Sequence, residues 1–69
     1  MRNELNLMLD FFEDVAGESG EFKIGKKLVS EYHAKDYINK AKELEGIGKI
    51  KIYSCWYKGK DLDVTGKVL

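Results

Sequence analysis

The sequence predicts a single α+β domain, residues 1–69, with three helices and a C-terminal β-hairpin. Two periodicities lead to this class: apolar residues recur every three or four positions early in the chain, and every second position after residue 49. A chain of 69 residues makes one domain with a thin core. So small a domain has little material for the walls of a deep catalytic cleft.

The first predicted helix spans residues 2–16 and has two apolar faces. Its wider stripe consists of residues three or four positions apart: Leu5, Met8, Leu9, Phe12, Val15 and Ala16. Leu7 and Phe11, spaced i and i+4, touch each other on the second face. This face needs cover, so we predict a homodimer through Leu7 and Phe11, with a C-terminal segment folded back over them as the alternative.

The middle of the chain predicts a short strand and two further helices. Residues 21–24 alternate polar and apolar, which is typical of a strand. Residues 25–32 predict a second helix whose inward residues are Leu28, Val29 and Tyr32. His33 marks a break, and residues 34–45 predict a third helix whose inward face is Tyr37, Ile38, Ala41 and Leu44.

Residues 49–68 predict a β-hairpin around the turn at residues 58–61. Strict alternation places Tyr53 and Tyr57 on one face of its first strand and Trp56 on the other. Exposed aromatic residues can stack on the bases of single strands or anchor a protein partner. The alternative, that they pack against the first helix, is left open by the pattern.

The formal net charge is zero, but the charge is unevenly distributed. Residues 1–22 hold one base and six acids, whereas residues 23–69 hold eleven lysines and six acids. An acidic and a basic region can form two faces of one domain. Because lysine is a flexible point charge, such a face favours phosphate contacts over bidentate reading of bases.

The sequence lacks the residues that several classes of function require. A lone histidine, His33, makes a poor catalyst, and a lone cysteine, Cys55, builds neither a disulfide nor a metal site. The glycines match no phosphate-binding loop. No apolar run reaches the ~20 residues that cross a bilayer, and no signal peptide is visible. We therefore expect a cytoplasmic protein that is not an enzyme and uses no metal or cofactor.

Two stretches carry a resemblance to a known family. Residues 22–24 lead into Leu28 and Val29, and in residues 41–50 Leu44 is followed by Gly46, Ile47, Gly48 and Ile50. This order resembles the winged helix-turn-helix superfamily, small DNA-binding regulators of bacteria, archaea and their viruses. The resemblance implies that the third helix enters the major groove of double-stranded DNA and that the hairpin is the wing.

The resemblance also implies a set of DNA-binding residues and a role in transcription regulation. Asn39 would read adenine, and Tyr57 would lie beside the wing tip. The residues that would contact phosphates are Lys26, Lys35, Lys40, Lys42, Lys58 and Lys60. The alternative is a protein–protein interaction module without DNA binding, which the zero net charge and the aromatic strand favour.

Overall fold

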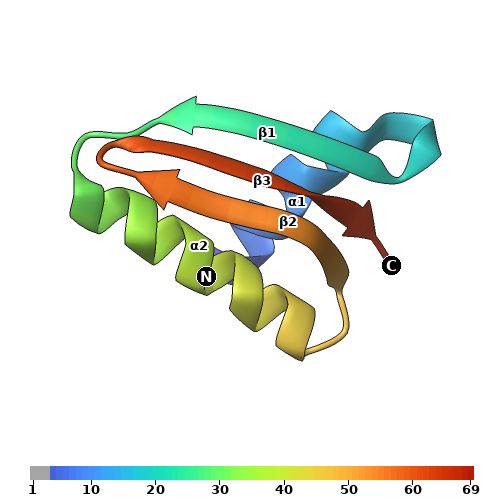
Figure 1. Cartoon of the computed structure of the whole chain (residues 1–69). Helices are drawn as coiled ribbons and strands as arrows, with labels where there is room; N and C mark the ends of the chain where they lie inside the picture. The colour runs from blue at the N-terminus through green and yellow to red at the C-terminus, as the bar shows by residue number, and fades with distance from the viewer. Residues whose placement is uncertain (1–3) are drawn as a thin grey trace.

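The computed structural model describes residues 4–69, which form two helices and a three-stranded sheet (Figure 1). The elements, in chain order, are α1 (Glu4–Ala16), a 3₁₀ turn η1 (Gly17–Ser19), β1 (Glu21–Lys27), α2 (Glu31–Gly46), β2 (Ile50–Lys58) and β3 (Asp61–Val68). The strand order is β1-β3-β2, and both outer strands are antiparallel to β3. The outer strands β1 and β2 are therefore parallel to each other.

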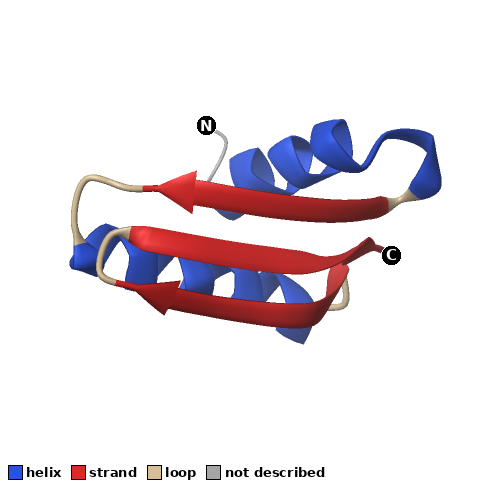
Figure 2. Cartoon of the chain, turned by 45° about the horizontal axis from the view of Figure 1, so that its top comes forward, coloured by secondary structure: helices blue, strands red, loops and turns tan. Residues whose placement is uncertain are grey.

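The helices and the sheet form two layers. Both helices lie on the same side of the sheet, and no described element covers the other side (Figure 2). α1 packs mainly against β1, and α2 mainly against β2. We call the uncovered side the open face of the sheet.

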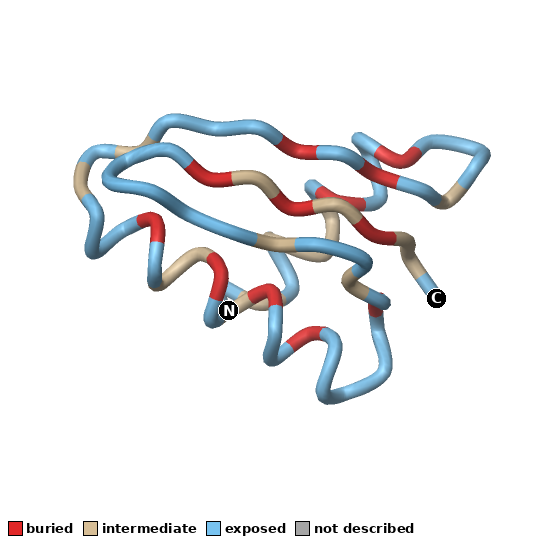
Figure 3. The backbone as a smooth tube through the Cα atoms, viewed as in Figure 1, coloured by how far each residue is buried: buried red, intermediate tan, exposed pale blue. Residues whose placement is uncertain are grey.

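The core fills the space between the two layers, where the buried stretches of helix and strand face each other (Figure 3). The ring of Phe12 is fully buried and stacks on the ring of Phe22, with 4.6 Å between centroids. The other buried residues alternate along the strands or follow one helix stripe: Ala16, Ile24, Ala34, Ile38, Ala41, Leu44, Ile50, Leu62 and Val64. This core fixes which side of each strand faces solvent.

The predicted winged helix-turn-helix is wrong, because the structure has a single helix, Glu31–Gly46, where two were predicted at residues 25–32 and 34–45, and residues 25–30 are not helical. Residues 25–27 instead extend β1 beyond the predicted strand at 21–24, since they pair with residues 61–63 of β3. Tyr32 and Val29, predicted to face inward, are 72% and 79% exposed.

The side chain of Ser30 explains where α2 begins. Its hydroxyl oxygen accepts a hydrogen bond from the backbone N–H of His33 at 3.3 Å, and it lies 2.7 Å from Nδ1 of the same residue. A serine N-cap satisfies one of the free N–H groups at a helix start. His33 therefore lies in the first turn of α2 rather than at a break between helices.

The other predicted elements differ less from the structure. The first predicted helix, 2–16, ends at Ala16 as α1 does, and its residues 2 and 3 lie outside the described residues. The predicted hairpin at 49–68 is present as β2 and β3. Gly59 has a φ of 59° at the first central position of its turn, where type II′ hairpins need glycine.

A β-bulge in β2 changes which side chains reach the open face. Ile52 pairs with Gly66, but Ser54 pairs with Thr65, so Tyr53 is an extra residue without a partner in β3. A bulge reverses the in–out alternation beyond it. Without the bulge, Trp56 would share the helix side with Ile50 and Ile52.

Near this bulge, a side chain of α2 binds the backbone of β2 at its outer edge. The backbone N–H of Ile52 donates a hydrogen bond to the Glu45 carboxylate at 2.7 Å. The side chain thus satisfies a backbone donor that has no strand beside it.

Candidate nucleic-acid interface

The open face of the sheet is rich in lysine. Leu62, Val64 and Gly66 of the central strand are buried on the helix side, so the residues between them point to the open face. Pairing extends this face across the sheet. Its lysines are Lys23, Lys27, Lys51, Lys58 and Lys67, and its acids are Glu21, Asp61 and Asp63.

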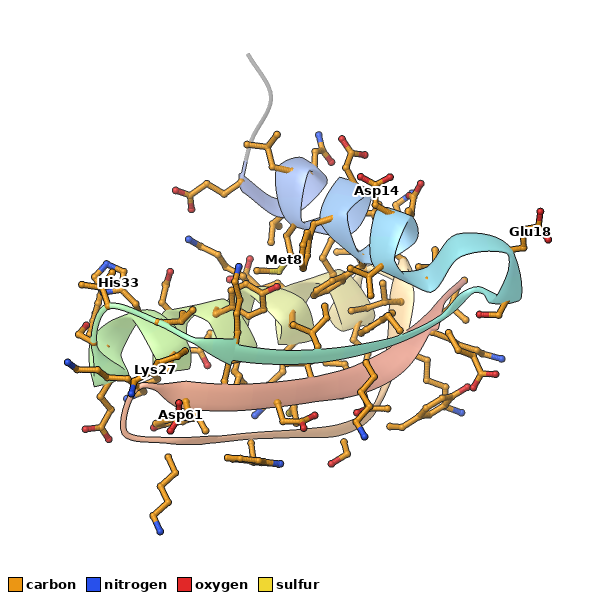
Figure 4. The ribbon with its side chains drawn as sticks, turned by 90° about the horizontal axis from the view of Figure 1, so that it is seen from above. Met8, Asp14, Glu18, Lys27, His33 and Asp61 are labelled. Carbon is orange, nitrogen blue, oxygen red and sulfur yellow. The ribbon has the colours of Figure 1, made fainter. Side chains whose placement is uncertain are left out.

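These five lysines make no ion pair within residues 4–69. The ion pairs among residues 4–69 all involve Lys40, which is not on this face. Asp63 accepts a hydrogen bond from the Thr65 hydroxyl at 3.3 Å. Lys27 and Asp61 face each other at the end of the sheet where β1 ends and β3 begins (Figure 4).

Trp56 lies on the outer strand β2 of this surface and is 52% exposed. Asp63 is its partner across the sheet, and Gly25 follows Asp63 in the same row on β1. A Cβ atom at Gly25 would have no neighbour within 4 Å, so the row is open on that side. An exposed indole on an open surface can stack on a flat ring such as a nucleobase.

The predicted wing residues lie at one end of this face. Lys58 ends β2, and Lys60 follows in the turn to β3. The backbone N–H of Leu28 donates to the carbonyl of Lys60 at 2.8 Å, which ties this turn to the loop before α2. Lys27, the last residue of β1, lies at the same basic end of the open face.

The predicted helix residues form a different surface. Lys35, Asn39 and Lys42 are exposed on α2, which lies behind the sheet as seen from its open face. Lys40 is held by Asp36, at 2.8 Å, and by Glu4. Hydrogen bonds to Asp36 and then to Glu4 raise the pKa of Lys40.

Tyr57 and Lys26, which were also predicted to contact DNA, lie on the helix side of the sheet. Tyr57 pairs with the buried Leu62. Lys26 also pairs with Leu62, and its ammonium lies 5.1 Å from the ring centroid of Phe11 and 5.3 Å from that of Tyr37. The structure therefore brings only Lys58 and Lys60 of the predicted set to the edge of the open face.

Trp56 and the sheet lysines were not predicted from the sequence as one site. The alternation of β1 and β3 could have indicated the lysines, because Lys23 alternates with buried Phe22 and Ile24. The position of Trp56 depends on the bulge at Tyr53, and no residue pattern marks it.

The predicted dimer residues are exposed on α1. Leu7 is 52% and Phe11 39% exposed. The alternative cover, a C-terminal segment folded over them, is wrong, because that segment forms the central strand of the sheet. The homodimer stays a prediction.

Tyr37 is unusual because its hydroxyl is buried and has no hydrogen-bond partner within residues 4–69. Burial raises the pKa of Tyr37 to about 12. We expect Tyr37→Phe to keep or raise the free energy of unfolding at neutral pH, by up to about 1 kcal/mol, because no hydrogen bond is lost. Urea denaturation followed by circular dichroism measures this, and a clear loss of stability would contradict it.

The same substitution has a pH-dependent part. The folded chain keeps the Tyr37 proton up to a pH of about 12, whereas the unfolded chain releases it near the ordinary value of 10.0. The unfolded state thus binds fewer protons between these values, and stability falls as the pH rises. We expect this contribution to the fall in the free energy of unfolding at alkaline pH in the wild type, and not in Tyr37→Phe.

Comparison with family models, with curated proteins and with solved structures finds no match for this chain. Within residues 4–69, neither helix is long and apolar enough to cross a membrane.

Proposed function

We propose that this chain binds single-stranded nucleic acid on the open face of its sheet. The observation that supports this most is Trp56, which is half-exposed on an uncovered sheet surface. The same surface holds five lysines that make no ion pair within residues 4–69. Stacking on an aromatic side chain contributes about 1–3 kcal/mol per base, and lysines neutralise the phosphates between stacked bases. Both contacts tolerate any sequence.

Asp63 gives the proposed site a polar group beside the stacking ring. It pairs directly with Trp56 across the sheet, and its carboxylate repels phosphate. A carboxylate can accept a hydrogen bond from the amino group of a base, as it does from cytosine. A base that carries an amino group would lie over Trp56 with that group toward Asp63, whereas thymine, which has none, would bind by stacking alone; in both cases the backbone would follow the lysines.

A single strand fits this surface better than a duplex does. Bases in a duplex are already stacked on each other, so their faces are not available to Trp56. The exposed side of α2 is the alternative surface for a duplex, but there Lys35 and Lys42 stand among Glu31 and Glu43. Charge reversal on each of the two surfaces would therefore reveal any binding of duplex DNA by α2.

Trp56 is the only tryptophan, so its fluorescence reports on the site directly. We expect a single-stranded oligothymidylate of about ten nucleotides to quench this fluorescence at ~50 mM salt, and the affinity to fall by at least about tenfold at ~200 mM. A duplex of the same length should quench it far less. Absence of quenching at low salt would refute the proposal.

Paired charge reversals separate the two surfaces. Lys27→Glu with Lys58→Glu changes one row of the open face, on either side of Asp61. We expect this pair to abolish binding of the single strand. Lys35→Glu with Lys42→Glu makes the same change of charge on α2 and serves as the matched control. If only the α2 pair loses binding, and duplex is preferred, the open face is the wrong surface.

A further inference from the structure

A second surface of the molecule, on the helix side, exposes apolar residues along α1. Leu7, Phe11 and Val15 follow one another at i, i+4 and i+8, and they are 52%, 39% and 42% exposed. Among residues 4–69 they are covered only in part: the ammonium of Lys26 lies over the ring of Phe11, 5.1 Å from its centroid. This stripe is separate from the open face of the sheet, because both helices lie on the other side (Figure 2).

A pocket lies beside the stripe, between α1 and the first half of α2. Its volume is about 300 Å³, and Leu7, which belongs to both the stripe and the pocket, lies at their junction. Met8, Leu28 and Tyr37 supply further apolar walls, and the polar lining consists of Glu4, His33, Asp36 and Lys40. Figure 4 shows Met8 beneath α1, on the side toward the sheet. The volume is enough for one large apolar side chain.

An exposed stripe that ends in a pocket is the shape that receives a helix. An amphipathic helix lays its apolar face in such a groove and places an anchor side chain in the pocket. A single stripe of three residues would offer only a flat contact. The pocket adds a site where one side chain is desolvated on several sides, as in the strongest contacts of protein interfaces.

The charge around the groove indicates which helix fits. Residues 4–16 of α1 carry four carboxylates, Glu4, Asp10, Glu13 and Asp14, and no lysine or arginine. The nearby bases are Lys26, over the ring of Phe11, and Lys40, which is held by Asp36 and Glu4. A partner with lysine or arginine beside its apolar face would complement α1.

The same charges disfavour a second copy of this chain in the groove. Pairing α1 with α1 of another copy would bring together two helices that each carry four carboxylates and, within residues 4–16, no lysine or arginine. Like charges placed together across an interface oppose association.

We propose that the groove formed by Leu7, Phe11, Val15 and the adjacent pocket binds a basic amphipathic helix of a partner protein. The partner places a large apolar side chain in the pocket and its basic residues along the acidic side of α1. This inference does not depend on the proposed binding of nucleic acid, because the two surfaces lie on opposite sides of the sheet.

The test uses two fluorescein-labelled helical peptides with the same leucines at i, i+3, i+4 and i+7. One has lysine at the remaining positions and the other has glutamate. By fluorescence anisotropy, we expect the lysine peptide to bind at least about tenfold more tightly at ~50 mM salt. Phe11→Ser should abolish this binding, whereas Val29→Ser, at a more exposed position outside both the stripe and the pocket, should not change it.

Three results would overturn the proposal: neither peptide binds, both bind equally, or Phe11→Ser binds as wild type does. A fourth result would show that a different molecule occupies the groove. If wild type sediments as a dimer that Phe11→Ser converts to a monomer, a second copy fills the groove instead. Quenching of Trp56 by oligothymidylate should be the same in Phe11→Ser and wild type, so the two proposals fail separately.

Discussion

Phe12→Ala is expected to leave the chain largely unfolded at room temperature. The Phe12 side chain is completely buried, stacks on Phe22 and contacts Tyr37 edge-on at 6.3 Å between centroids. Truncating a buried phenylalanine costs about 3–5 kcal/mol. Total stability of a domain is only about 5–15 kcal/mol, and small domains lie at the low end.

Circular dichroism during thermal and urea denaturation would measure this loss. The neighbouring residue supplies a matched control, because Phe11 is on the same helix but 39% exposed. Phe11→Ala should cost no more than about 1 kcal/mol. If the two substitutions had equal effects, the packing of α1 on the sheet through Phe12 would be wrong.

Gly66→Ala is expected to be the most damaging change of a single methyl group. Gly66 lies in the centre of the sheet, opposite Phe22 on one side and Ile52 on the other. An added Cβ atom would collide with the backbone carbonyl of Lys51 and would press on the Phe22 ring at 3.0 Å. This carbonyl is part of the backbone of β2, so it cannot move aside as the end of a flexible side chain can.

Overpacking of a core costs about 1–3 kcal/mol, and we expect the upper part of this range or more because the clash is with backbone. Gly25→Ala is the control, since that position has no neighbour within 4 Å. Gly66 also lies beside the bulge, so the damage should change the emission of Trp56 in any fraction that stays folded. Equal stabilities of the two variants would contradict the register of β2 on β3.

The sequence predicted the elements whose apolar pattern is long and regular. The stripe that contains Phe12 predicted α1, and the alternation after residue 49 predicted the hairpin. The region between residues 25 and 34 was predicted wrongly. There, local pattern competes with pairing to β3, which is distant in the chain, and this pairing keeps residues 25–27 extended.

The candidate site was predictable only in part, for a similar reason. Lys58 and Lys60 were assigned to the hairpin tip, where the structure has them. Trp56 could not be assigned to the open face, because one unpaired residue, Tyr53, reverses the direction of every later side chain in β2. A shift of one residue leaves no mark in composition.

The hydrogen bond from Ile52 to Glu45 has a consequence for self-assembly. Strands at the margin of a sheet can recruit further chains through their unused backbone groups, and the products are aggregates or fibrils. At β2 one such group is occupied by a carboxylate from α2, and the adjoining bulge at Tyr53 disrupts a flat template. The irregularity that turns Trp56 outward thus also protects this margin of the molecule from growing by addition of strands.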